Sequence, residues 1–283
     1  MVCREASTGP SQCAMATTPA WRWSARKAFF LSGVWITPGL WYATSAPASK
    51  PRPSESWRNL FAEINVPKID AGEILLQVKG AFVCGTDVRM YYNGYQGISE
   101  TTPMILGHEG SGVVTRCGSD VKNFKEGMRV AIAPNVGGGI CNYCVSGNTH
   151  LCLDVKAVGI HLPGFFAEYV KIPENFLRQG NVVEIPDRLS FEEAALAEPL
   201  ACVFNAFERS KMQPGETVLV IGAGPIGLMH AKMAQIAGVE KIIINDLSRD
   251  RLDLCRQIDS TFITLESENL KEALDTLTGG ARC

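Results

Sequence analysis

The spacing of hydrophobic residues changes character near Glu216. From there onward, short runs of aliphatic and β-branched residues alternate with longer segments in which apolar residues recur at helical spacing. The pattern predicts three strands, each followed by a helix: strands at 217–221, 241–245 and 261–265, and helices at 225–237, 249–258 and 268–277. Repeated strand–helix units favour a parallel sheet with right-handed crossovers.

Between Asn59 and about Gln213 the pattern is β-rich instead. Short β-branched runs at 74–78, 112–115 and 129–132 are separated by turn sequences at 70–72 and 125–127. This predicts a compact β-barrel with functional loops. The chain is therefore expected to be an α/β protein with two domains, residues 59–213 and residues 214–283, which suits its length of 283 residues.

Residues 1–58 share neither pattern, although they contain all five tryptophans. Their apolar stretch at 29–43 follows two basic residues, but it is shorter than the roughly 20 residues of a membrane-spanning helix, and Pro38-Gly39 interrupts it. Three interpretations stay open: a signal peptide, a transit peptide, or a segment foreign to the fold. The absence of hydrophobic periodicity favours the last.

Composition narrows the class of protein. Hydrophobic residues make up 46% of the chain and charged residues 20%, which is typical of a globular protein. The formal net charge of −2 favours neither nucleic acid nor an anionic membrane as a partner. Three of the ten cysteines cluster at Cys141, Cys144 and Cys152, and this short spacing indicates metal binding rather than a disulfide framework.

The first strand of the alternating region ends in a glycine-rich turn, Gly222-Ala223-Gly224-Pro225-Ile226-Gly227. Because the turn joins a buried strand to a helix, it predicts a dinucleotide site. Gly222 would permit a tight turn, Gly224 the close approach of a pyrophosphate, and Gly227 close helix–strand packing. The free N–H groups of the helix start would receive the phosphates, and Pro225 needs no hydrogen bond at the first helical position.

Asp246 ends the second strand, at the spacing of a carboxylate that binds the adenosine ribose. It favours NAD, because a carboxylate repels the extra phosphate of NADP. Arg249 and Arg251 follow it and could receive that phosphate, or they could be solvated charges on a helix face.

Candidate zinc ligands occur in separate stretches of the β-rich region. Cys84 stands in Cys84-Gly85-Thr86-Asp87, His108 precedes Glu109 in a glycine-rich run, and Glu198 precedes Pro199. Thiolate, imidazole and carboxylate together suit a catalytic zinc that keeps one position open. Taken singly, each residue has a structural alternative: a buried thiol, a hydrogen-bonded histidine, or a helix-capping glutamate.

Together these motifs resemble the zinc-containing medium-chain dehydrogenases, most closely the polyol branch around sorbitol and threonine dehydrogenases. The resemblance covers about residues 59–280. It implies a GroES-like catalytic domain followed by a Rossmann domain. It also implies Zn²⁺ held by Cys84, His108 and Glu109 or Glu198, with Thr86 near the alcohol oxygen and Arg251 beside the adenosine of NAD.

The reaction implied by this resemblance is the oxidation of a secondary alcohol or polyol. Zinc would lower the pKa of the substrate hydroxyl, Thr86 would help to pass the proton outward, and hydride would move to the nicotinamide. The resemblance also implies a small-molecule substrate, a homo-oligomer and a cytoplasmic location.

The sequence departs from the family pattern in two places. The lobe containing Cys141, Cys144 and Cys152 resembles a structural zinc loop, but its expected first cysteine is Gly138, so the four-coordinate shell is incomplete and we expect no second tightly held zinc. The sequence also ends after three strands of the predicted sheet, so little turnover is expected from the chain as given. A catalytically impaired fragment and a zinc-free reductase therefore stay open as alternatives, although Cys84 with His108-Glu109 argues against the second.

Overall fold

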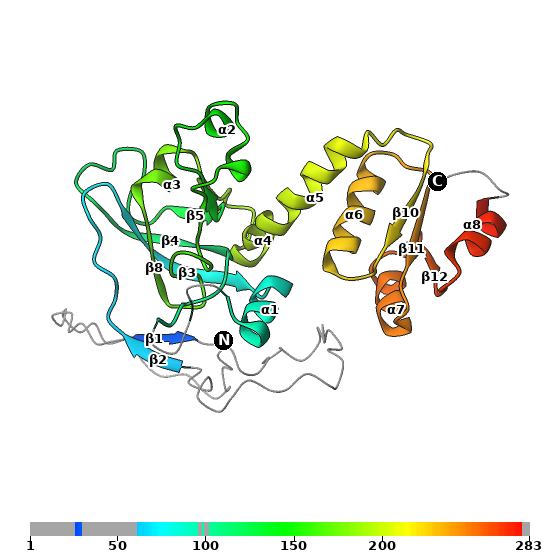
Figure 1. Ribbon diagram of the computed structural model, residues 1–283, viewed down its shortest axis with the longest axis horizontal. Coiled ribbons are helices and arrows are strands. Elements are labelled where there is room, and N and C mark those ends of the chain that lie inside the picture. Colours follow the sequence, from blue (N-terminus) through cyan, green and yellow to red (C-terminus); the bar gives the residue numbers. More distant parts are fainter. Residues whose placement is uncertain (1–25, 30–60, 96–97, 99–101, 279–283) are drawn as a thin grey trace, which may run out of the picture. The chain divides into compact units, whose positions relative to one another are not determined.

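The computed structural model describes residues 26–29, 61–95, 98 and 102–278 (Figure 1). Most of the first segment, including its apolar stretch from residue 30 onward, and the last residues 279–283 lie outside this description. The chain forms two compact units that divide between Glu192 and Glu193, and each is described by itself. Within the described ranges, no helix has both the length and the apolar character needed to cross a membrane.

The first unit is built on a five-stranded antiparallel sheet. The order is β8-β3-β4-β5-β9, with β3 at Ile74–Phe82, β4 at Glu109–Cys117, β5 at Arg129–Ile132, β8 at Tyr169–Ile172 and β9 at Val182–Glu184. The three β-branched runs predicted as strands are confirmed, and two of them extend further than predicted. Ile74, Val114, Val130 and Ile172 are fully buried in the core of this sheet.

Glycines in β4 allow a close approach that a side chain would prevent. A Cβ atom on Gly110 would lie 2.2 Å from the ring of Phe165, and one on Gly112 would lie 2.1 Å from the carbonyl oxygen of Gln77. Both glycines lie within three residues after Glu109 in the sequence. The tight packing of this strand therefore fixes the position of the candidate ligands at its start.

Shorter elements surround the sheet. Cys84 is the N-cap of helix α1, which sequence analysis did not predict. The elements are β1 Arg26–Phe29 paired antiparallel with β2 Phe61–Ile64, α1 Gly85–Asn93, β6 Asn135–Val136 paired with β7 Lys156–Ala157, α2 Asn142–Val145, η2 Thr149–Leu151, α3 Glu174–Arg178, and α4 Phe191–Ala195, which crosses the division between the units.

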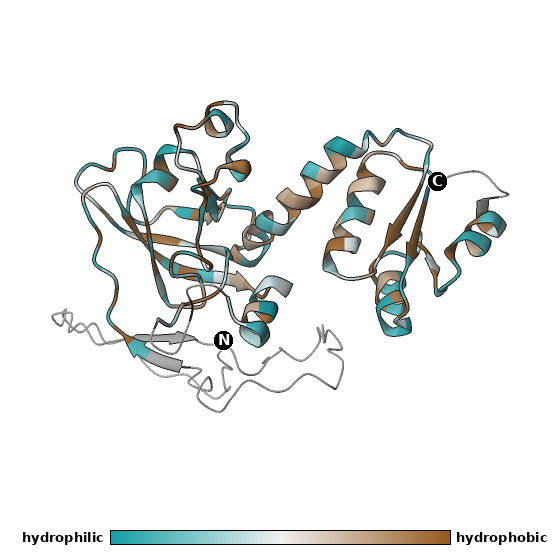
Figure 2. Ribbon diagram, viewed as in Figure 1, coloured by the Kyte–Doolittle hydropathy of each residue, from teal (hydrophilic) through white to brown (hydrophobic). Residues whose placement is uncertain are grey.

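The second unit has a parallel sheet in the order β10-β11-β12, as the strand–helix pattern predicts. Its elements are α5 Ala197–Ser210, β10 Thr217–Ile221, α6 Pro225–Ile236, β11 Lys241–Asn245, α7 Arg249–Ile258, β12 Ile263–Leu265 and α8 Leu270–Thr278. Figure 2 shows that β10 and β11 are strongly hydrophobic, and Figure 1 shows α6 and α8 on opposite sides of the sheet. Helix α5 packs along α6, so this unit begins before Gln213, where sequence analysis placed the change of domain.

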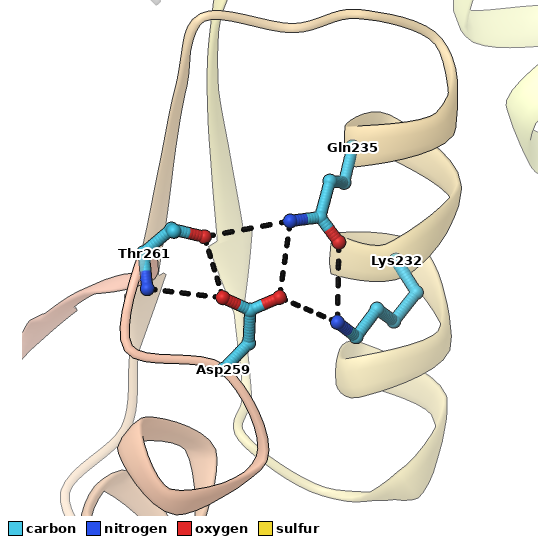
Figure 3. A network of polar contacts seen from close by, with 4 residues as sticks. All are labelled: Lys232, Gln235, Asp259 and Thr261. Atoms are coloured by element: carbon cyan, nitrogen blue, oxygen red, sulfur yellow. Dashed lines mark hydrogen bonds and ion pairs between the residues drawn. The ribbon is translucent and has the colours of Figure 1, made fainter.

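Strand β12 begins two residues later than predicted because of a polar network (Figure 3). Asp259 accepts hydrogen bonds from the backbone N–H of Thr261 at 3.0 Å and from its hydroxyl at 2.6 Å, which folds 259–261 into a turn. From helix α6, Lys232 Nζ lies 2.5 Å from Asp259 Oδ2, and Gln235 donates to the same oxygen at 3.0 Å. These contacts hold the pKa of Asp259 well below its usual range. The contact with Lys232 contributes most, and the hydrogen bonds from Thr261 and Gln235 contribute less.

Candidate metal and dinucleotide sites

Antiparallel pairing of β3 and β4 brings the predicted zinc ligands together. Phe82 of β3 lies opposite Glu109 of β4, so Cys84, just beyond β3, lies next to His108, just before β4. One ligand atom each from Cys84, His108 and Glu109 lies within 4.8 Å of the other two. The histidine and the glutamate are each only 6% exposed, and the cysteine is half-buried. A thiol, an imidazole and a carboxylate so arranged fit a zinc ion with room for a further ligand.

Asp87 organises this cluster, and sequence analysis assigned it no role. It is fully buried in the first turn of α1. Its carboxylate accepts hydrogen bonds from the backbone N–H groups of Cys84 at 2.9 Å and Gly107 at 3.2 Å. One of its oxygens lies 3.3 Å from Nδ1 of His108. An acid three residues after an N-cap is a capping signal, and that spacing from Cys84 could have identified Asp87.

The same carboxylate controls the charge of His108. Burial alone would lower the pKa of this imidazole, but the adjacent carboxylate of Asp87, with a smaller contribution from Cys84, raises it to about 10. Nδ1 of His108 is buried and, although close to Asp87, has no aligned hydrogen bond. A metal ion binding here must therefore displace a proton, as it does at thiolate and imidazole ligands generally.

The other two predicted residues of this site differ in their surroundings. Thr86 lies in the first turn of α1, between Cys84 and Asp87, and is half-buried. Glu198 lies in the first turn of α5, in the second unit. The three-residue cluster is thus formed by the first unit alone.

The glycine-rich turn has the geometry that its sequence predicts. Gly222 has a φ of 104°, in the region that favours glycine. Gly224 is the N-cap of α6, with Pro225 in its first turn, and a Cβ atom on Gly224 would meet nothing within 4 Å. A Cβ atom on Gly227, in contrast, would lie 1.8 Å from the carbonyl oxygen of Gly222. The turn is therefore tight within itself and open at the helix start, where an anion can approach.

Asp246 is fixed beside this turn. Its carboxylate accepts hydrogen bonds from the backbone N–H groups of Ala223 and Ser248, both at 2.8 Å, and Arg251 Nη1 lies 3.5 Å from it. Burial would raise the pKa of Asp246, but these two hydrogen bonds and the charge of Arg251 lower it overall. Arg249 instead pairs with Glu266 at 3.0 Å, which favours its interpretation as a surface charge.

Comparison with known proteins finds a matching domain and relatives among the alcohol and polyol dehydrogenases. Residues 70–187 match the alcohol dehydrogenase GroES-like domain. Sorbitol dehydrogenase of Bacillus subtilis is 38% identical over 216 residues, 75% of this chain and 60% of that protein. L-threonine 3-dehydrogenase of Escherichia coli K12 is 36% identical over 220 residues, 77% of this chain and 62% of that protein. The structure of 2R,3R-butanediol dehydrogenase from Bacillus subtilis aligns with a TM-score of 0.67 and 29% identity, covering 77% of this chain and 64% of that one.

The matched domain, the sorbitol and threonine dehydrogenases and the solved structures together indicate the zinc-dependent medium-chain dehydrogenase family. It spans about 60% of the length of the curated relatives that it matches. The matched domain, 70–187, contains the whole cluster of Cys84, His108 and Glu109.

A second cluster of candidate metal ligands consists of three cysteines. Ligand atoms of Cys141, Cys144 and Cys152 lie within 4.8 Å of one another, in the lobe between β6 and β7. Gly138, where a fourth cysteine was expected, lies beside them: its backbone N–H is 3.4 Å from Sγ of Cys152. Three thiols are thus close enough together to bind one metal ion, and residue 138 does not supply a fourth.

Proposed function

We propose that this protein is a zinc-dependent, NAD-linked dehydrogenase of secondary alcohols or polyols. Residues 59–213 would hold the metal and the substrate, and residues 214–283 the adenosine part of NAD. The observation that carries the proposal is the buried cluster of Cys84, His108 and Glu109. The proposal includes a small-molecule substrate, a cytoplasmic location and a homo-oligomeric state.

Each residue of the metal site has a proposed role. Cys84, His108 and Glu109 are metal ligands, and Glu198 is a further candidate for a ligand or an acid–base group. Bound zinc supplies Lewis acidity, which lowers the pKa of an alcohol hydroxyl. The Thr86 hydroxyl accepts the alcohol proton and passes it toward solvent.

Asp87 is a positioning residue rather than a catalytic one. It touches two backbone N–H groups and lies against the imidazole of His108, so it fixes the ring that binds the metal. Partners of this kind orient metal-binding histidines and raise their basicity.

The proposed NAD site uses the glycine turn and the end of β11. The N–H groups at the start of α6, after Gly224 and Pro225, face the pyrophosphate, while Ile226 and Gly227 continue the same turn. Asp246 accepts hydrogen bonds from the ribose hydroxyls, and Arg251 lies beside the adenosine. Because the pKa of Asp246 is lowered, its carboxylate carries the negative charge that disfavours NADP.

Metal content tests the central claim independently of turnover. Cys84→Ser and His108→Ala should each remove the tightly bound zinc that elemental analysis detects in the purified chain, because each deletes a ligand atom. Cys117→Ser is the matched control, because the Cys117 thiol lies outside the cluster. It donates a hydrogen bond to the backbone oxygen of Phe124. Retention of zinc in both ligand variants would overturn the site.

Activity tests the substrate class. The zinc-loaded protein would be assayed for NADH formation with sorbitol, xylitol, threonine and 2,3-butanediol, chosen because relatives named for three of these substrates match this chain. Turnover that disappears in His108→Ala supports the proposal. NAD binding with zinc bound but no reduction with any secondary alcohol would instead favour the alternative of a catalytically impaired fragment.

A further inference from the structure

Glu266 follows strand β12 and lies at the same edge of the parallel sheet as Asp246. Each of the two acids comes directly after the last residue of its strand, and Asn245 pairs with Leu265 in the register of β11 and β12. The buried side chain of Asn245 donates hydrogen bonds to the backbone oxygens of Leu265 and Ser267, both at 3.0 Å. The backbone on either side of Glu266 is thus fixed to the end of β11, so Glu266 is held beside the proposed adenosine site.

Two carboxylates and two arginines meet at this edge as two ion pairs. Arg251 Nη1 lies 3.5 Å from Asp246 Oδ2, and Arg249 Nε lies 3.0 Å from Glu266 Oε2. The side chain of Arg249 is 75% exposed and that of Glu266 43%. The second pair is therefore open to solvent and can be reached by a ligand bound at the first.

The start of helix α7 would suit a phosphate group if Glu266 were absent. Arg249 is the first residue of α7, directly after the N-cap Ser248, whose backbone N–H donates to Asp246 at 2.8 Å. A helix N-terminus and an arginine both attract phosphate. If Asp246 binds the ribose hydroxyls, the 2′-phosphate that distinguishes NADP from NAD belongs next to this carboxylate, in the region that Arg249 flanks. The ion pair with Glu266 thus holds back a cation that would favour NADP.

We propose that Glu266 is a specificity-determining residue for the cofactor, an inference that rests on the NAD site proposed above. Asp246 disfavours the 2′-phosphate by direct repulsion. Glu266 acts by a second route, because it engages Arg249 and cancels a positive charge that would otherwise attract the phosphate. Loss of Asp246 alone therefore relaxes the preference for NAD only in part, and reversal of the preference requires the loss of both carboxylates.

Equilibrium binding of two adenosine nucleotides to the whole chain tests the proposal without turnover. Adenosine 5′-monophosphate and adenosine 2′,5′-bisphosphate differ only in the 2′-phosphate, and neither contains nicotinamide, so hydride transfer does not enter the measurement. Calorimetric titration gives both dissociation constants, and their ratio measures the discrimination against the 2′-phosphate. The titrations are run at low ionic strength, because salt screens exposed charges.

Glu266→Gln should shift this ratio toward the bisphosphate by about twofold to fivefold, since an exposed ion pair is worth little. In the Asp246→Ala background the same change should shift it by about tenfold or more, because Arg249 can then donate to the phosphate with neither carboxylate beside it. Adding Arg249→Gln to this double variant should abolish the gain. Glu268→Gln is the matched control: it removes one exposed carboxylate two residues further along the same segment and keeps the pair of Arg249 with Glu266.

The outcomes separate the role of Glu266 from the NAD site itself. An equal shift in Glu268→Gln, no further shift when Glu266→Gln is added to Asp246→Ala, or a gain that survives Arg249→Gln would each overturn the role of Glu266. If Asp246→Ala proves unstable because two backbone N–H groups lose their acceptor, Asp246→Asn takes its place, since its amide oxygen still accepts. Failure of the wild-type chain to bind adenosine 5′-monophosphate would overturn the proposed NAD site and this inference with it. Normal binding of that nucleotide without the expected shifts would overturn this inference alone.

Discussion

Two glycines of the dinucleotide turn should respond to alanine in opposite ways. At Gly224 an added methyl group meets nothing within 4 Å, and the φ of −79° suits any residue. The loss of unfolded-state entropy favours alanine by about 0.4–1 kcal/mol, and the N-cap preference for glycine opposes it by a similar amount. We therefore expect the free energy of unfolding of Gly224→Ala to change by less than about 0.5 kcal/mol.

NAD binding by Gly224→Ala should nevertheless fall. The methyl group would occupy the open space at the helix start, where the pyrophosphate must approach the backbone. Overpacking of a close contact costs about 1–3 kcal/mol, which corresponds to roughly 5-fold to 150-fold in the dissociation constant.

Gly227→Ala should instead damage the fold. Its methyl group would lie 1.8 Å from the carbonyl oxygen of Gly222, a backbone atom that cannot move without deforming the turn. Overpacking costs about 1–3 kcal/mol, and the higher helix propensity of alanine returns about 1 kcal/mol. Because the contact is with a rigid backbone atom, we expect the upper part of the overpacking range, about 2–3 kcal/mol, and so a net destabilisation of about 1–2 kcal/mol together with weaker NAD binding.

Calorimetric titration with NAD and urea unfolding followed by circular dichroism measure the two quantities. Each variant serves as the control for the other, because both add one methyl group to the same turn. Wild-type NAD affinity in Gly224→Ala would refute the placement of the pyrophosphate. Wild-type stability in Gly227→Ala would refute the close contact with Gly222.

Three further predictions concern single aspartates. Asp87→Ala leaves two backbone N–H groups without their acceptor and His108 without its neighbour, so zinc affinity measured by chelator competition should fall about 10-fold to 100-fold; unchanged affinity would contradict the positioning role. The pKa of Asp259 is lower in the folded than in the unfolded chain, where it is about 3.9, so its stabilisation is complete above about pH 4 and is lost as the pH falls further. Asp259→Asn should flatten the dependence of urea unfolding on pH in that range, and an unaltered slope would count against the network with Lys232. Asp246→Ala should shift the ratio of NAD to NADP affinities toward NADP, and an unaltered ratio would assign Asp246 another role.

The sequence by itself determined the elements of the second unit. The bounds of β10, β11 and α7 agree with the prediction, because aliphatic runs and helical spacing are local signals that burial in a parallel sheet then requires. The glycine turn could also be interpreted locally, since Gly222 needs its positive φ and Gly227 its close contact with Gly222 within the same six residues. Even the positions of the candidate zinc ligands were visible as motifs.

What the motifs could not show is which residues meet. Cys84 and His108 are 24 positions apart in the printed sequence, and only the pairing of β3 with β4 brings them together. The contact of Asp87 with His108 depends on the same pairing, so the capping signal of Asp87 could not reveal that contact. Periodicity describes which face of an element is buried, whereas partners across a sheet depend on register.

Tertiary structure also decided where one strand begins and how the cysteine lobe between β6 and β7 is arranged. Thr261 and Phe262 are residue types that favour strands. Asp259 nevertheless binds Thr261 and holds it in the turn 259–261, so β12 begins only at Ile263. In the cysteine lobe, three thiols are evident from spacing, but the hydrogen bond from the N–H of Gly138 to Sγ of Cys152 forms only when the loop closes. In both cases a contact between a side chain and the backbone forms only on folding. At Asp259 it overrides the local preference for a strand, and in the cysteine lobe it adds to the arrangement that the cysteine spacing indicates.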